Sequence, residues 1–148
     1  MKIVSGGQTG VDRAALDVAL ALGLECGGWC PAGRWAEDGH IDARYPLVET
    51  PSTDPAQRTE WNARDADGTL ILTDGAASPG TELCKDAARR LGRPLSVQWL
   101  TSPDVVAFQD WLRTHGIRTL NVAGPRESEA PGVHAQAREA LRILLQSV

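Results

Sequence analysis

Three glycine-containing turns are the strongest candidates for binding chemistry in this sequence. They are Gly6–Gly10, Gly80-Thr81 and Gly124-Pro125-Arg126, and each leads from a predicted strand into a helical pattern. The free backbone N–H groups at the start of a helix bind oxyanions, because the helix dipole is positive there. Glycine lets the ligand approach the backbone closely. Hydroxyl donors stand in or near these turns at Thr9, Thr81 and Ser128. Together the turns predict a site for a phosphate or another oxyanion.

Neither common nucleotide-binding signature is present in these turns. The first turn, Gly6-Gly7-Gln8-Thr9-Gly10, does not fit G-x-x-x-x-G-K-[ST], and no lysine follows it. A P-loop nucleotide hydrolase is therefore disfavoured. The pattern G-x-G-x-x-G is also absent, so the usual dinucleotide fingerprint is missing.

The elements that must position these turns alternate along the chain. Apolar runs typical of strands occupy residues 2–5, 24–29, 47–49, 69–73, 95–99 and 119–123. Helical patterns occupy residues 11–22, 55–64, 81–91, 103–115 and 131–145. Strands separated by helices of this length predict right-handed βαβ units, and so a single Rossmann-like three-layer α/β domain with a mostly parallel sheet over residues 1–148. The carboxyl ends of its strands share one edge, so we expect the three turns to face a common crevice.

Several polar residues near the turns have two interpretations. Residues 30–46 form a long irregular stretch, which in a compact domain is usually functional. Asp12 either orders the first turn or binds ligand hydroxyls. Arg58 and Asn62 share a helix face, where they either line the crevice or hold the long stretch.

Composition excludes several other classes of protein. The net charge is −4 with no basic cluster, so a nucleic-acid partner is not expected. No apolar run is long enough to span a membrane, and no signal-peptide pattern opens the sequence, so we expect a cytoplasmic protein. Cys26, Cys30 and Cys84 fit neither a disulfide framework nor a zinc signature. The three histidines are scattered, and we expect no metal ligands among them.

Longer motifs make the sequence similar to a known family over almost its whole length. Ordered blocks carry the resemblance: residues 5–13 (SGGQTGVDR), 28–31 (GWCP), 33–34 with 36–39 (GR, AEDG), 49–50, 58–62 (RTEWN), 67–71 (DGTLI) and 121–126 (NVAGPR) followed by Ser128. In these blocks the sequence resembles the molybdenum-cofactor carrier family, a branch of the Rossmann-like superfamily that also contains lysine-decarboxylase-like phosphoribohydrolases.

The resemblance implies a homo-oligomer, dimer or tetramer, that binds the molybdenum cofactor, a pterin monophosphate carrying molybdenum, or molybdate itself. Molybdenum enzymes would then accept the cofactor. Trp29, Trp35 and Trp61 become candidates for stacking on the pterin ring, and Arg126 for a bidentate contact with an oxyanion. The expected cofactor-binding residues are Gly6, Gly7, Gln8, Thr9, Gly10, Arg34, Gly80, Thr81, Gly124, Pro125, Arg126 and Ser128; no catalytic residue is expected.

Departures from the family pattern affect the predicted ligand contacts. Ala32 stands where relatives carry a basic residue, which leaves Arg34 as the nearest cation. Pro79 replaces a glycine and removes one N–H donor from the middle turn.

Two other functions stay open beside a non-catalytic carrier. One is a sensor of a nucleotide-derived ligand. The other is hydrolysis of nucleoside 5′-monophosphates, for which relatives use a glutamate after the middle turn. Here Glu82 is displaced by two residues, a rotation of about 200° on a helix, so it cannot replace that glutamate.

Overall fold

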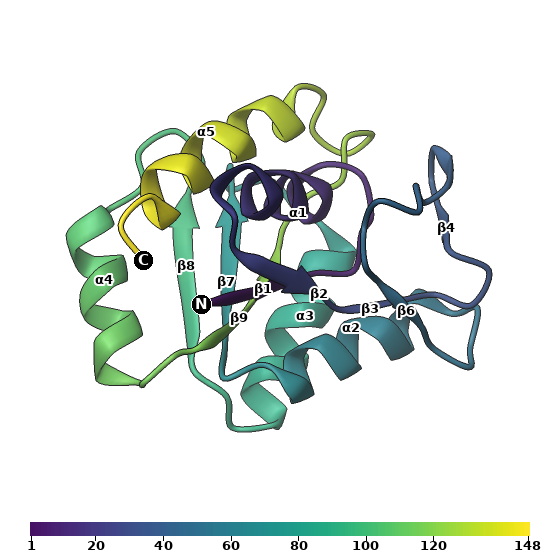
Figure 1. Ribbon diagram of the computed structural model, residues 1–148, viewed down its shortest axis with the longest axis horizontal. Helices are drawn as coiled ribbons and strands as arrows, with labels where there is room; N and C mark the ends of the chain where they lie inside the picture. Colours follow the sequence, from purple (N-terminus) through teal and green to yellow (C-terminus); the bar gives the residue numbers. More distant parts are fainter.

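The computed structural model describes residues 1–148 and contains a five-stranded, wholly parallel sheet (Figure 1). Its strand order is β2-β1-β9-β7-β8. The strands are β1 (Lys2–Val4), β2 (Glu25–Gly27), β7 (Gly68–Thr73), β8 (Leu95–Trp99) and β9 (Thr119–Ala123). The predicted Rossmann-like α/β fold with a parallel sheet is confirmed.

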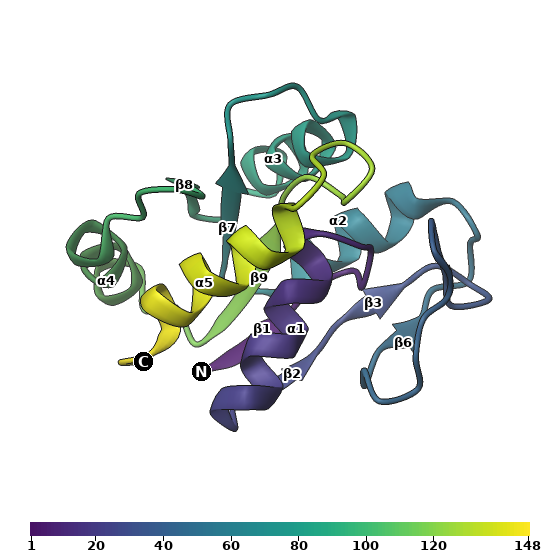
Figure 2. The same cartoon turned by 90° about the horizontal axis from the view of Figure 1, so that it is seen from above.

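Helices cover both faces of the sheet. They are α1 (Val11–Leu22), α2 (Pro55–Asp65), α3 (Pro79–Arg90), α4 (Val105–Thr114) and α5 (Val133–Leu145). In Figure 1, α1 and α5 lie above the sheet and α2 and α3 below it, and Figure 2 shows α1 and α5 side by side. No helix is long and apolar enough to cross a membrane.

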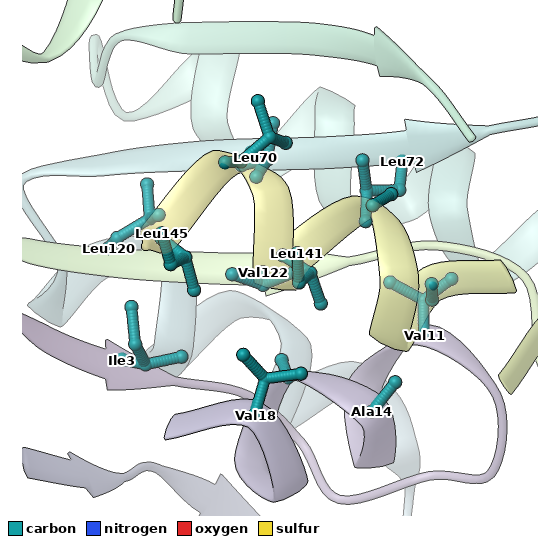
Figure 3. Close-up of a cluster of buried hydrophobic side chains, with 14 of the residues drawn as sticks. Ile3, Val11, Ala14, Val18, Leu70, Leu72, Leu120, Val122, Leu141 and Leu145 are labelled. Carbon is teal, nitrogen blue, oxygen red and sulfur yellow. The ribbon is translucent and has the colours of Figure 1, made fainter. Parts of the chain in front are cut away.

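The main core lies between the sheet and the α1, α4 and α5 layer. Figure 3 shows Ile3, Leu120 and Leu70 of the strands packed against Val18 of α1 and Leu141 of α5. All of these side chains are buried. The central strands β7 and β9 are mainly apolar because helices cover them on both sides, whereas edge strand β8 keeps exposed side chains.

Two helix starts show how the sequence sets the element boundaries. Asp54 caps α2 by accepting a hydrogen bond from the Ala56 N–H at 2.9 Å, as expected. Helix α3 begins at Pro79, before the expected Thr81, because proline at the first helical position has a suitable φ and needs no N–H partner.

The predicted strand 24–29 is interrupted at Gly28, a correction to the sequence-based expectation. Gly28 has a φ of 125°, and a Cβ there would lie 2.4 Å from the Ser5 carbonyl oxygen. The chain leaves the main sheet at this point, and β3 (Trp29–Cys30) pairs instead with β6 (Val48–Glu49).

The predicted irregular stretch 30–46 contains a small antiparallel hairpin of β4 (Trp35–Ala36) and β5 (Gly39–His40). We call residues 35–40 the tip hairpin. It lies at the opposite end of the molecule from α4 (Figure 1).

Candidate functional site

A pocket of about 230 Å³ opens where β1, β7 and β9 end. The residues that follow these strands and the start of α3 form its walls, so the expected common crevice exists. Trp35 of the tip hairpin and residues of α2 close the opposite side. The polar lining comprises Gln8, Asp12, Arg58, Thr59, Asn62, Ser78, Thr81, Asn121, Arg126 and Glu129.

Arg58 is the most deeply placed cation of this pocket. Its side chain is only 11% exposed, and Nη1 donates to the Gly6 carbonyl oxygen at 2.8 Å and lies 3.7 Å from Asp12 Oδ2. A Cβ on residue 6 would stand 2.1 Å from Nη1, so glycine at this position lets the Arg58 side chain lie against the first turn. The Nε–H of Arg58 is buried without a hydrogen-bond partner. A buried donor of this kind is costly unless a ligand or water accepts from it.

Asp12, in the first turn of α1, is the buried acid beside Arg58. Burial raises its pKa from 3.8 to about 6, although Arg58 and the backbone N–H groups of Gln8 and Gly6 oppose the change. The carboxylate therefore carries its full charge only above pH 6, and its charge offsets that of Arg58.

The start of α3 supplies hydroxyl groups and open backbone. The Ser78 and Thr81 hydroxyls lie 2.7 Å apart, and Ser78 Oγ also donates to Glu129 Oε1 at 3.2 Å. Gly80 lines the pocket, and a Cβ built there would have no neighbour within 4 Å. Packing therefore does not require glycine at this position, whereas close approach by an anion would explain it.

Substitution of Gly80 separates these two explanations. Gly80→Ala is expected to leave the fold intact and to raise the free energy of unfolding by about 0.5 kcal/mol, because the glycine lies in a helix. The added methyl group should nevertheless weaken phosphate binding severalfold. Calorimetric titration beside denaturant unfolding tests both effects; unchanged affinity would place the anion elsewhere.

Cys84 and Asn121 form the buried floor of the pocket. Asn121 Nδ2 donates to Thr69 Oγ1 at 3.2 Å and lies 3.6 Å from Cys84 Sγ. Burial raises the pKa of the Cys84 thiol to about 12, so the thiol stays protonated and is not a nucleophile at neutral pH.

Arg126, the predicted bidentate ligand contact, lines the pocket near its rim. Its side chain is 48% exposed, and Nε lies 3.6 Å from both Glu37 Oε2 and Glu129 Oε1. Arg126 can reach an anion only in competition with these two carboxylates, whereas Arg58 has the single carboxylate of Asp12 nearby and an Nε–H without a partner.

The predicted binding residues occupy three places. Those in the pocket are Gly6, Gln8, Gly80, Thr81, Gly124 and Arg126. Thr9, Gly10 and Ser128 line a separate open groove on the far side of the tip hairpin. Gly7 and Pro125 act through their backbone: the Gly7 carbonyl accepts from Arg13, and the Pro125 carbonyl accepts from the Val11 N–H at 3.1 Å.

Arg34, expected to contact the ligand, lies outside the pocket. Its guanidinium donates to four backbone carbonyls, those of Ile41, Asp42, Tyr45 and Leu47. The segment after the tip hairpin forms few strand-to-strand hydrogen bonds, and Arg34 supplies donors for its backbone carbonyl groups instead. We therefore assign Arg34 a structural role and remove it from the candidate site.

Arg58 and Asn62, which share one face of α2, have different roles in the fold. Arg58 contacts both the pocket and the first turn, whereas Asn62 holds the Trp29 backbone by hydrogen bonds of 2.8 Å and 3.0 Å. Trp29 and Trp61 pack edge to face with ring centroids 4.8 Å apart, and neither lines the pocket. Trp35 is the tryptophan that does.

Glu37 had no predicted role. In the fold its carboxylate links the turn that contains Thr9 to Ser128, which follows the Gly124-Pro125-Arg126 turn.

Comparison with known proteins identifies the family. Residues 3–145 match the Circularly permutated YpsA SLOG family, so the chain belongs to this family. A solved structure named "Putative molybdenum carrier protein", from Syntrophus aciditrophicus SB, is 39% identical in sequence and superposes with a TM-score of 0.91. The match covers 97% of this chain and 94% of that one. A search of curated proteins gave no match.

Proposed function

We propose that this protein binds and carries the molybdenum cofactor, or molybdate, in the pocket beside Arg58 and does not transform it. The unpartnered Nε–H of buried Arg58 is the observation that carries the proposal, because it is a donor in need of an acceptor. The name of the similar structure from Syntrophus supports molybdenum as the cargo.

The polar groups around Arg58 suit one oxyanion end of such a ligand. The N–H groups at the start of α3, the Thr81 hydroxyl and Arg58 together offer donors for a phosphate. Trp35, which is 39% exposed at the pocket wall, offers a flat apolar surface to the pterin ring. Molybdenum enzymes would be the acceptors of the cargo.

Cellular setting and assembly are part of the same proposal. Three free thiols suit a reducing compartment, so we place the carrier in the cytoplasm. Val97 and Trp99 of edge strand β8, with exposures of 47% and 55%, favour a homo-oligomer that covers them.

Identification of the copurifying ligand tests the function directly. Protein isolated from cells that make molybdenum cofactor should contain a pterin monophosphate by mass spectrometry and an equal amount of molybdenum by metal analysis. An Arg58→Met protein prepared in parallel should contain neither. A nucleotide without molybdenum would contradict the carrier and support the sensor of a nucleotide-derived ligand.

Hydrolysis of nucleoside monophosphates is the second candidate, and the placement of Glu82 disfavours it. Glu82 does not line the pocket and pairs with Lys85 at 3.0 Å. Incubation with adenosine monophosphate should therefore release no adenine, as measured by chromatography. Steady release that disappears in Asp12→Asn would contradict this prediction, since Asp12 is the acid of the pocket that titrates near pH 6.

A further inference from the structure

Glu37 lies in the turn between β4 and β5 of the tip hairpin, and its carboxylate accepts hydrogen bonds from donors in two other turns. Oε1 accepts from the Thr9 hydroxyl and, at 3.1 Å, from the Ser128 N–H. Oε2 accepts from the Ser128 hydroxyl at 2.5 Å and lies 3.6 Å from Arg126 Nε. The side chain retains only 21% exposure.

These donors form an anion-binding arrangement in their own right. Two hydroxyls, one backbone N–H and one guanidinium converge on a single carboxylate. Burial raises the pKa of Glu37, but the bonds from Ser128 and Thr9 and the charge of Arg126 outweigh burial and lower it. The Glu37 carboxylate is therefore ionised at neutral pH.

The same hairpin also forms part of the pocket wall. Trp35 lines the pocket two residues before Glu37, and Gln8 Oε1 accepts from the Glu37 N–H at 2.9 Å. Arg13 holds the neighbouring Asp38 with hydrogen bonds of 2.6 Å and 3.1 Å. Release of the Glu37 carboxylate alone would thus free a set of anion donors beside a pocket wall that stays in place.

We propose that Thr9, Ser128 and Arg126 form a second anion subsite, which Glu37 occupies until the second anionic group of a ligand displaces it. The Glu37 carboxylate then mimics that anionic group while the ligand is absent. This inference rests on the proposed function only in taking the ligand to carry two anionic ends.

The dimensions of the pocket support such a displacement. At about 230 Å³ the closed pocket is smaller than the roughly 300–1,000 Å³ usual for organic ligands. A phosphate fits beside Arg58, but a second anionic group on a ring that packs against Trp35 needs the space that the Glu37 carboxylate occupies. The donors of Thr9 and Ser128 then keep an anionic acceptor throughout the exchange.

Tungstate, an electron-dense oxyanion, provides the test in crystals of four forms of the full chain. Wild-type crystals should show an anomalous peak near Arg58 and none between Thr9 and Ser128. Glu37→Ala crystals should show a second peak between Thr9 and Ser128, and Glu37→Ala/Ser128→Ala crystals should lose it. Asp38→Ala is the matched control, since it removes one charge from the same hairpin but frees Arg13 instead; it should behave as wild type.

The two proposals fail in different ways in this experiment. Absence of the second peak in Glu37→Ala, or an equal peak in wild type or Asp38→Ala, would overturn the subsite. Absence of the peak near Arg58 in every form would count against the proposed function alone. In solution, calorimetry with phosphate should give one additional equivalent bound for Glu37→Ala.

Discussion

Arg58→Met is expected to weaken phosphate or molybdate binding by about ten- to a hundredfold. Charge-assisted hydrogen bonds contribute about 1.5–3 kcal/mol, and Arg58 is the buried cation of the pocket with a free donor. Methionine keeps much of the length and packing of the side chain but cannot donate. Calorimetric titration of the folded variant measures the effect.

Arg34→Met is the matched control for this substitution. Arg34 is also partly buried, and its guanidinium bonds are all to backbone carbonyls outside the pocket. Its loss should lower the free energy of unfolding but leave affinity within about twofold of wild type. Equal loss of affinity in both variants would show that binding depends on the general stability of the fold and not on a contact with Arg58.

The fold was predictable because each level of the sequence points to the same arrangement. The β7 segment Thr69–Thr73 has an apolar centre, Leu70-Ile71-Leu72, and Asp54-Pro55 combines a side-chain cap with a proline at the first helical position. Alternation of such strands with helices leaves a parallel sheet as the simplest solution. The parallel order of that sheet places the Gly6–Gly10 turn and Gly124 at one edge, so their proximity can be predicted without any tertiary contact being known.

The placement of Arg58 in the pocket was not predictable from the same patterns. Arg126 follows a glycine-proline turn, which predicts a ligand contact, and in the fold it lines the pocket with two carboxylates 3.6 Å away. Arg58 lies on a helix with no glycine nearby, and its position depends on the missing Cβ of Gly6, more than fifty residues away. Such a long-range fit leaves no local signal.

Glu37 escaped prediction for a related reason. An acidic residue in a polar hairpin usually faces solvent, and the sequence does not reveal that Thr9 and Ser128 converge on it. The one available signal was that all three residues lie in blocks shared with the same family. Gly28 likewise ends a strand because of the nearby Ser5 carbonyl, a contact across the fold.

Asp12 remains the one group of the pocket whose charge changes near physiological pH. In the folded protein its pKa is about 6, whereas the unfolded chain should have the ordinary value of 3.8. The folded state therefore binds the proton more tightly than the unfolded state does. The stability associated with this proton is fully present below pH 3.8 and is lost as the pH rises through about 6.

Asp12→Asn is accordingly expected to stabilise the protein at pH 7.5 by about 2–3 kcal/mol, since each pKa unit corresponds to about 1.4 kcal/mol. The attraction of Arg58 is already included in the raised pKa, so its loss does not reverse the sign. Urea unfolding at pH 4.0, 6.0 and 7.5 should show the gain shrinking toward zero at the lowest pH. Sulfate, which does not titrate over this range, should bind wild type more tightly as the pH falls through 6, because Asp12 then no longer offsets Arg58. The Asp12→Asn variant should lack this pH dependence of sulfate binding.

The stability measurement can contradict the prediction. An Asp12→Asn variant less stable than wild type at pH 7.5 would show that the ion pair with Arg58 outweighs the cost of burying the carboxylate.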